Sequence, residues 1–147
     1  MSIPAPMLAR IVTPQSVDDA RRIIEIACLA VASDGRLAAE EISALRVLNR
    51  ELGAVSPQEL EPLIQAALGI SNRDDRTERL RTVAAALSNE DARHCAYKVS
   101  VVTALADLAS ADEEFEFDLD VQDALRLAPE VADRLSAEVN EALVDRS

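Results

Sequence analysis

The sequence predicts an all-α protein, a single compact bundle of about seven helices at residues 16–147 that follows an irregular lead-in at residues 1–15. Three observations predict this class. The length of 147 residues is typical of one domain. Apolar residues make up 49% of the chain and can build a core, which must be aliphatic because aromatic residues make up only 2%. Only three glycines interrupt a chain rich in helix formers, whose apolar residues recur at helical spacing.

The first two helices are predicted on either side of the turn SDGR, at residues 33–36. Ser16 is placed to cap the first helix, and the acids just after it favour the positive end of a helix. Gly35 tolerates the positive φ of a sharp turn, and Gly53 is the predicted stop of the second helix. The two apolar stripes are Ala20, Ile23, Ile24, Ala27, Cys28 and Val31, then Ile42, Leu45, Leu48 and Leu52.

The third helix is expected to begin at Ser56-Pro57, a capping residue with proline at the first helical position, and to end near Gly69. Residues 71–76, SNRDDR, are predicted to form a polar connection. The fourth helix then closes around SNED, at residues 88–91. The apolar stripes are Leu60, Leu63, Ile64, Ala67 and Leu68 in the third helix, and Leu80, Val83, Ala84 and Leu87 in the fourth.

The fifth helix, from about Asp91 to Ser110, is predicted to be the central one. Its apolar residues cover nearly its whole circumference, which is typical of a helix buried on all sides. A short sixth helix around Val121 follows, and Pro129 starts a seventh. The apolar residues of the fifth helix are Cys95, Ala96, Tyr97, Val99, Val101, Val102, Leu105, Ala106 and Leu108.

The net charge of −12 restricts the partners of the chain. Nucleic acid is disfavoured because affinity for its phosphates comes mainly from Lys and Arg, and anionic membrane surfaces are disfavoured in the same way. No stretch approaches a membrane span, and the start MSIPAPMLARIV does not have the pattern of a signal peptide. We therefore expect a cytoplasmic protein without direct membrane insertion, whose partner is a basic protein surface or a metal cation. Nothing in the sequence indicates an oligomeric state.

Residues 106–123, ADLASADEEFEFDLDVQD, depart from helical patterning because acids alternate with apolar residues. If Asp112 is position one of a calcium loop, acids occupy positions one, three, five, seven, nine and twelve, an oxygen-rich set of the kind calcium prefers. Against this, Phe117 stands where such loops need glycine, and Asp123 is shorter than the usual bidentate Glu. Three interpretations stay open: a divalent-cation site, a surface for a basic partner, and a solvated connection pinned by Phe115 and Phe117.

The turn after the first helix and the acidic stretch after the fifth share a pattern. In each, a helix end rich in small residues is followed by an Asp, an apolar residue three positions later, more acids and a new apolar helix. This internal repeat predicts two helix–acidic turn–helix units packed as a pseudo-symmetric pair, with both acidic turns at one end of the bundle. The corresponding acids are Asp34 with Asp112, Glu40 with Asp118, and Glu41 with Asp120 if one residue is inserted in the second copy.

The first copy, AxxAxAxDGxLxxEE from Ala27 to Glu41, resembles the signature of the TerB-like family. That all-helical family includes tellurite-resistance proteins and the N-terminal region of a membrane-anchored DnaJ-type co-chaperone. The resemblance extends over residues 16–144. It implies a compact helical bundle with acidic residues gathered on one surface and no established catalytic chemistry. It also implies an association with metal-oxyanion stress, envelope stress or protein assembly.

The sequence contains few residues in an arrangement that could support catalysis. Cys28 and Cys95 lie inside apolar helical patterns and are predicted to be small buried hydrophobes. With His94 as the only histidine, no C-x-x-C and no base beside either cysteine, neither a zinc site nor a nucleophile is indicated. We therefore predict a non-enzymatic protein-interaction module with an acidic surface, the alternative being a calcium-type cation-binding protein. Both functions would use Asp34, Glu40, Glu41, Asp112, Glu114, Glu116, Asp118, Asp120 and Asp123.

Overall fold

The computed structural model describes residues 11–32, 39–70, 72–105 and 120–144, and this part of the chain contains helices and no strand. The all-α prediction is confirmed. A short helical segment at residues 120–124 precedes the last helix. The longer helices are α2 (Val17–Val31), α3 (Ala39–Leu52), α4 (Pro57–Leu68), α5 (Arg73–Ala85), α6 (Glu90–Leu105) and α8 (Pro129–Val144).

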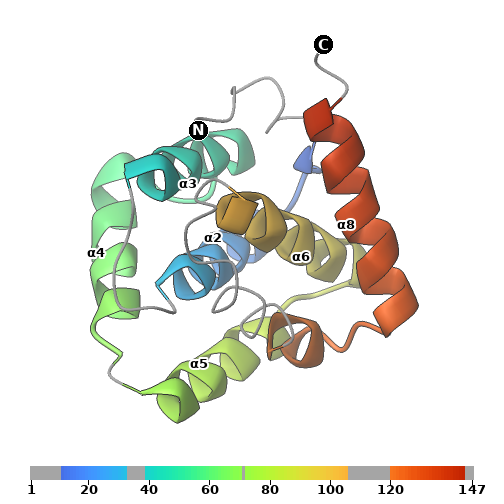
Figure 1. Ribbon diagram of the computed structural model, residues 1–147. Helices are drawn as coiled ribbons and strands as arrows, with labels where there is room; N and C mark the ends of the chain where they lie inside the picture. Colours follow the sequence, from blue (N-terminus) through green and yellow to red (C-terminus); the bar gives the residue numbers. More distant parts are fainter. Residues whose placement is uncertain (1–10, 33–38, 71, 106–119, 145–147) are drawn as a thin grey trace.

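Two helices, α2 and α6, share the centre of the bundle, with α3, α4, α5 and α8 arranged around them (Figure 1). They form the largest helix–helix interface among the described elements; α2 also packs on α3, α4 and α5, and α6 on α3 and α8. The predicted central position of the helix containing Val99 and Val102 is confirmed, since both side chains are fully buried. The central position of α2 follows from Ile26, Leu29 and Ala30, which are buried outside its predicted stripe.

Most predicted helix ends are confirmed by the cap that forms there. The Ser16 hydroxyl accepts a hydrogen bond from the Asp19 amide at 3.2 Å, and Ser56 caps α4 in the same way, followed by Pro57. Gly53 ends α3 with φ +62°, the left-handed conformation that glycine adopts without strain. The prediction that Pro129 starts the last helix is also confirmed.

The predicted polar connection at residues 71–76 is wrong, because α5 already begins at Arg73. Asn72 is its N-cap, and its side-chain oxygen accepts a hydrogen bond from the Asp75 amide at 2.8 Å. The acids Asp74 and Asp75 in the first turn favour the positive end of the helix dipole. The same residues that indicate a polar turn therefore initiate a helix.

Polar side chains fasten the connections to the bundle. The Asn49 amide, which is buried, bonds both backbone groups of Val55, at 2.9 Å to its carbonyl and 3.0 Å from its amide. The Tyr97 hydroxyl lies 3.3 Å from that of Ser136 on α8 and accepts a hydrogen bond from Gln122 at 3.4 Å. Tyr97 thereby joins α6 to α8 and to the short helical segment at 120–124.

Candidate functional site

The N-terminal ends of α2 and α6 are joined by hydrogen bonds. The carboxylate of Asp19, in the first turn of α2, accepts hydrogen bonds from the hydroxyl of Ser88 and, at 3.2 Å, from its backbone amide. On the other side of this junction, Asp91 of α6 accepts from the side chains of Thr13 at 3.1 Å and Gln15 at 2.9 Å. We call these five residues the N-terminal junction.

The junction fixes the relative direction of the two central helices. Because α2 and α6 start side by side, pack along their lengths and contain 15 and 16 residues, they run parallel and end at the same side of the bundle (Figure 1). Residues 33–38 follow α2 and residues 106–119 follow α6. The C-terminal ends of α2 and α6, which these two segments follow in the sequence, therefore lie on one side of the bundle, which we call the acidic end.

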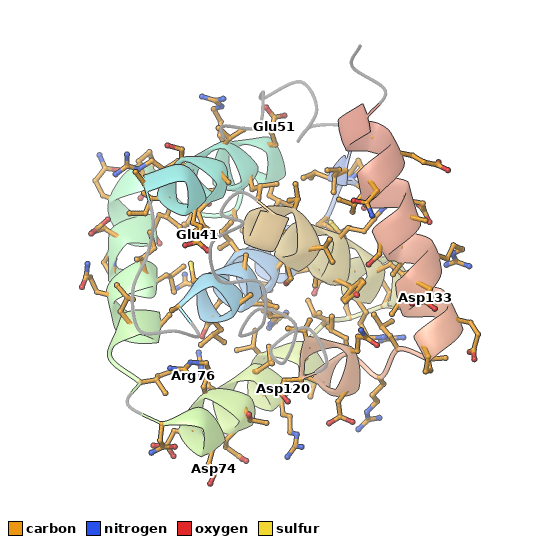
Figure 2. The ribbon with its side chains drawn as sticks, in the orientation of Figure 1. Glu41, Glu51, Asp74, Arg76, Asp120 and Asp133 are labelled. Atoms are coloured by element: carbon orange, nitrogen blue, oxygen red, sulfur yellow. The ribbon has the colours of Figure 1, made fainter. Side chains whose placement is uncertain are left out.

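Most of the predicted site residues lie outside the described part of the chain: Asp34, Asp112, Glu114, Glu116 and Asp118. Of the others, Glu40 and Glu41 are in the first turn of α3, and Glu41 is buried with only 4% of its surface exposed. Figure 2 shows Glu41 between α3 and α2. Asp120 lies apart from it, at the start of the short helical segment at 120–124. The carboxylate of Glu41 is therefore not accessible to a large partner.

The second described pair, Asp120 and Asp123, lies in the helical segment at 120–124. Asp120 is half-buried, whereas the Asp123 side chain is 71% exposed and accepts a hydrogen bond from Arg81 of α5 at 3.4 Å. An ion pair this exposed contributes little to stability. Across the described ranges, no group of three or more His, Cys, Asp and Glu side chains is placed to hold a metal ion. The calcium alternative therefore stays a prediction about the segment that contains Asp112.

The pKa of Asp19 at the N-terminal junction reflects opposing effects of burial, hydrogen bonding and a nearby charge. Burial by itself raises the pKa of Asp19, but the hydrogen bonds from Ser88 and Ser16 and the charge of Arg22, 3.5 Å away, outweigh it and hold the pKa below 3.8. The carboxylate is therefore ionised at neutral pH and fully engaged within the protein. Sequence reasoning used Asp19 only as an acid near a helix start, because its partner Ser88 is 69 positions away and gives no local signal.

The remaining potentially reactive side chains are two cysteines and one histidine. Cys28 and Cys95 are buried free thiols, as predicted. Burial, with a smaller effect of the Glu25 charge, raises the pKa of Cys28 to about 12, and burial also raises the pKa of Cys95. Both are therefore protonated at neutral pH and poor nucleophiles. His94 is half-buried, with its ring 3.4 Å from the Glu90 carboxylate one turn earlier on α6.

Comparison of the chain with protein-family models, with curated proteins and with solved structures found no match. The TerB-like resemblance therefore remains a hypothesis that depends on the sequence motif alone. None of the described helices combines the length and the apolar character needed to cross a bilayer.

Proposed function

We propose that this protein is a non-catalytic binding module that captures a basic surface of a protein partner through its acidic end. The observation that carries the proposal is the parallel arrangement of α2 and α6. It supports a shared location for residues 33–38, which contain Asp34, and for the acid-rich residues 106–119.

The described surface favours electrostatic over apolar recognition. Val17 is the only large hydrophobic side chain strongly exposed among the described residues. The chain carries 27 acidic against 15 basic side chains, so a long-range negative field surrounds it. A field of this kind steers a basic partner into contact and acts mainly on the association rate. The TerB-like resemblance, with its link to assembly and stress response, agrees with a role inside a larger complex.

The proposal is tested by neutralising the acidic end. Wild-type protein and a variant in which Glu114, Glu116, Asp118 and Asp120 are replaced by their amides are compared for capture of partners from a lysate, followed by mass spectrometry. A control variant changes the charge equally at four other exposed acids: Glu51, Glu130, Asp133 and Glu141. We expect the first variant to lose its partners in a salt-sensitive manner and the control to retain them. Equal capture by all three proteins would contradict the proposal.

A further inference from the structure

A small cavity of about 240 Å³ lies where the C-terminal part of α5, the first turn of α6 and the short helical segment at 120–124 meet. Figure 1 shows this segment beside α5, and the ion pair between Arg81 and Asp123 joins the two. Three alanines and a leucine form the apolar part of the wall, and two guanidinium groups provide its charge. The lining residues in the described part of the chain are Ala84, Ala85, Leu87, Arg93, Ala124 and Arg126.

The two arginines of this cavity, Arg93 and Arg126, form no ion pair and no side-chain hydrogen bond with any described residue. In a chain of net charge −12, other basic side chains do find carboxylates: Arg79 contacts Glu25 at 2.6 Å and Lys98 contacts Glu138 at 3.8 Å. The acids that precede the two arginines already have partners, Asp91 being bonded by Thr13 and Gln15. Asp123 contacts Arg81 and Glu90 contacts His94, both at 3.4 Å. Arg93, which is half-buried, and Arg126, which is exposed, therefore both line this hollow without a carboxylate partner among the described residues.

The backbone at Arg126 shows that this side chain is placed there against a local preference. Its φ is +58°, and it is the only described residue other than glycine with a positive φ. The turn closes with the Arg126 amide bonded to the Asp123 carbonyl at 3.1 Å and the Leu127 amide bonded to the Gln122 carbonyl at 3.0 Å. This is the Schellman motif, in which glycine normally occupies the left-handed position.

The same motif ends α3 and provides an internal comparison. There the Gly53 amide bonds the Arg50 carbonyl and the Ala54 amide bonds the Asn49 carbonyl, both at 3.2 Å, with Gly53 at φ +62°. The chain thus uses glycine where only the turn geometry matters. At the cavity it has arginine instead, although a Cβ atom disfavours this conformation. Strain of this kind is typical of sites where a side chain serves a ligand.

We propose that this cavity binds the phosphate group of a small molecule between Arg93 and Arg126. Two guanidinium groups match a phosphate dianion in charge, and their planar forks donate paired hydrogen bonds to its oxygens. A water molecule takes about 30 Å³ in the liquid, so the cavity has room for a phosphate with a short organic group against the alanine wall. It lies below the roughly 300–1,000 Å³ of pockets for drug-sized ligands, which favours a small ligand.

The test is isothermal titration of the whole chain with inorganic phosphate and, separately, with glycerol 3-phosphate, at constant ionic strength. Sulfate and succinate are titrated as a second oxyanion and a dicarboxylate. We expect the two phosphate compounds to bind more tightly than sulfate or succinate. Tighter binding of glycerol 3-phosphate than of inorganic phosphate would assign the site to an organic phosphate, and the reverse order would assign it to the free ion. Absence of binding by both phosphate compounds at about 10 mM, or preferential binding of succinate, would overturn the proposal.

Three variants locate the binding. Arg93→Gln and Arg126→Gly should each weaken phosphate binding by about ten-fold or more, whereas Arg134→Gln, an exposed arginine on α8, should leave it unchanged. Arg126→Gly also restores the preferred residue of the turn, so it should melt at or above the wild-type temperature while losing the ligand. Loss of binding in a variant at least as stable as the wild type excludes misfolding as the cause. Wild-type affinity in both cavity variants would contradict the assignment.

Discussion

Two regions of the molecule, the N-terminal junction and the short helical segment at 120–124, differ in how their acids are used. At the N-terminal junction, Asp19 and Asp91 are engaged by Ser88, Thr13 and Gln15, so their charge is used to hold the helices together. In the short helical segment at 120–124, by contrast, Asp123 is largely exposed and contacts only an exposed arginine, Arg81, among the described residues. The difference separates acids that stabilise the fold from acids that remain available to a partner.

A substitution in the apolar centre of the bundle gives the largest expected effect on stability. Val99→Asp places a charge without partners at a fully buried position of α6, and we expect it to cost more than about 5 kcal/mol and to unfold the domain. Val17→Asp is the control, since Val17 is 71% exposed in the first turn of α2, and its effect should stay within about 0.5 kcal/mol. Circular dichroism melts measure both. A normal cooperative melt for Val99→Asp would refute the central position of α6.

The comparison between the N-terminal junction and the segment at 120–124 is sharpened by one substitution in each. Asp19→Asn removes a charged acceptor that is buried and bonded to Ser88, and we expect a loss of about 2 kcal/mol in the free energy of unfolding. Asp123→Asn removes an exposed ion pair, and its effect should stay within about 0.5 kcal/mol. Urea denaturation at pH 7 measures both values. Equal losses would show that the two regions do not differ in how their acids contribute to stability.

The contribution of Asp19 should also depend on pH in a defined direction. Its pKa is lowered in the folded protein, so the stability it supplies is fully present above the ordinary value of 3.8 and is lost as the pH falls through the folded pKa. The difference between wild type and Asp19→Asn should therefore be constant between pH 5 and 7, about 2 kcal/mol, and shrink below about pH 4. A difference that grows in acid would contradict the assigned direction of the shift.

The smallest effect is expected from divalent cations at the acidic end. If this end serves a basic protein surface, millimolar calcium, magnesium or manganese should raise the melting temperature by less than about 1 °C, because only a ligand that favours the native state stabilises it. Scanning calorimetry with and without the cations measures the shift. A larger rise that Asp112→Asn with Asp118→Asn abolishes would instead assign the segment to a cation.

The sequence predicted the fold well where local chemistry decides it. Caps at Ser16 and Ser56, the stop at Gly53 and the proline start at Pro129 are local signals, and all four are confirmed. The start of α5 was missed because asparagine followed by acids is typical both of a polar turn and of a capped first turn. Local residues alone do not distinguish the two.

The buried charged residues were harder to predict, although they share a pattern. Asp19, Glu41 and Arg76 are the buried charged residues of the described chain, and each lies in the first turn or so of its helix. Each also stands four positions before a fully buried aliphatic residue: Ile23, Leu45 and Leu80. Helical spacing therefore places each on the buried face, although charged side chains are ordinarily expected at the surface. For this reason Glu41 was grouped with the exposed acids.

The central claim is that the two acidic segments meet at one end of the bundle. Spin labels on Asp34→Cys and Asp112→Cys report the distance between them, and labels on Val17→Cys and Asp34→Cys give an internal reference. The reference spans α2, whose 15 residues measure about 22 Å at about 1.5 Å per residue. The native thiols Cys28 and Cys95 are buried and protonated, so they label slowly at neutral pH. We predict a shorter distance for 34–112 than for 17–34; an equal or longer distance would contradict the shared acidic end.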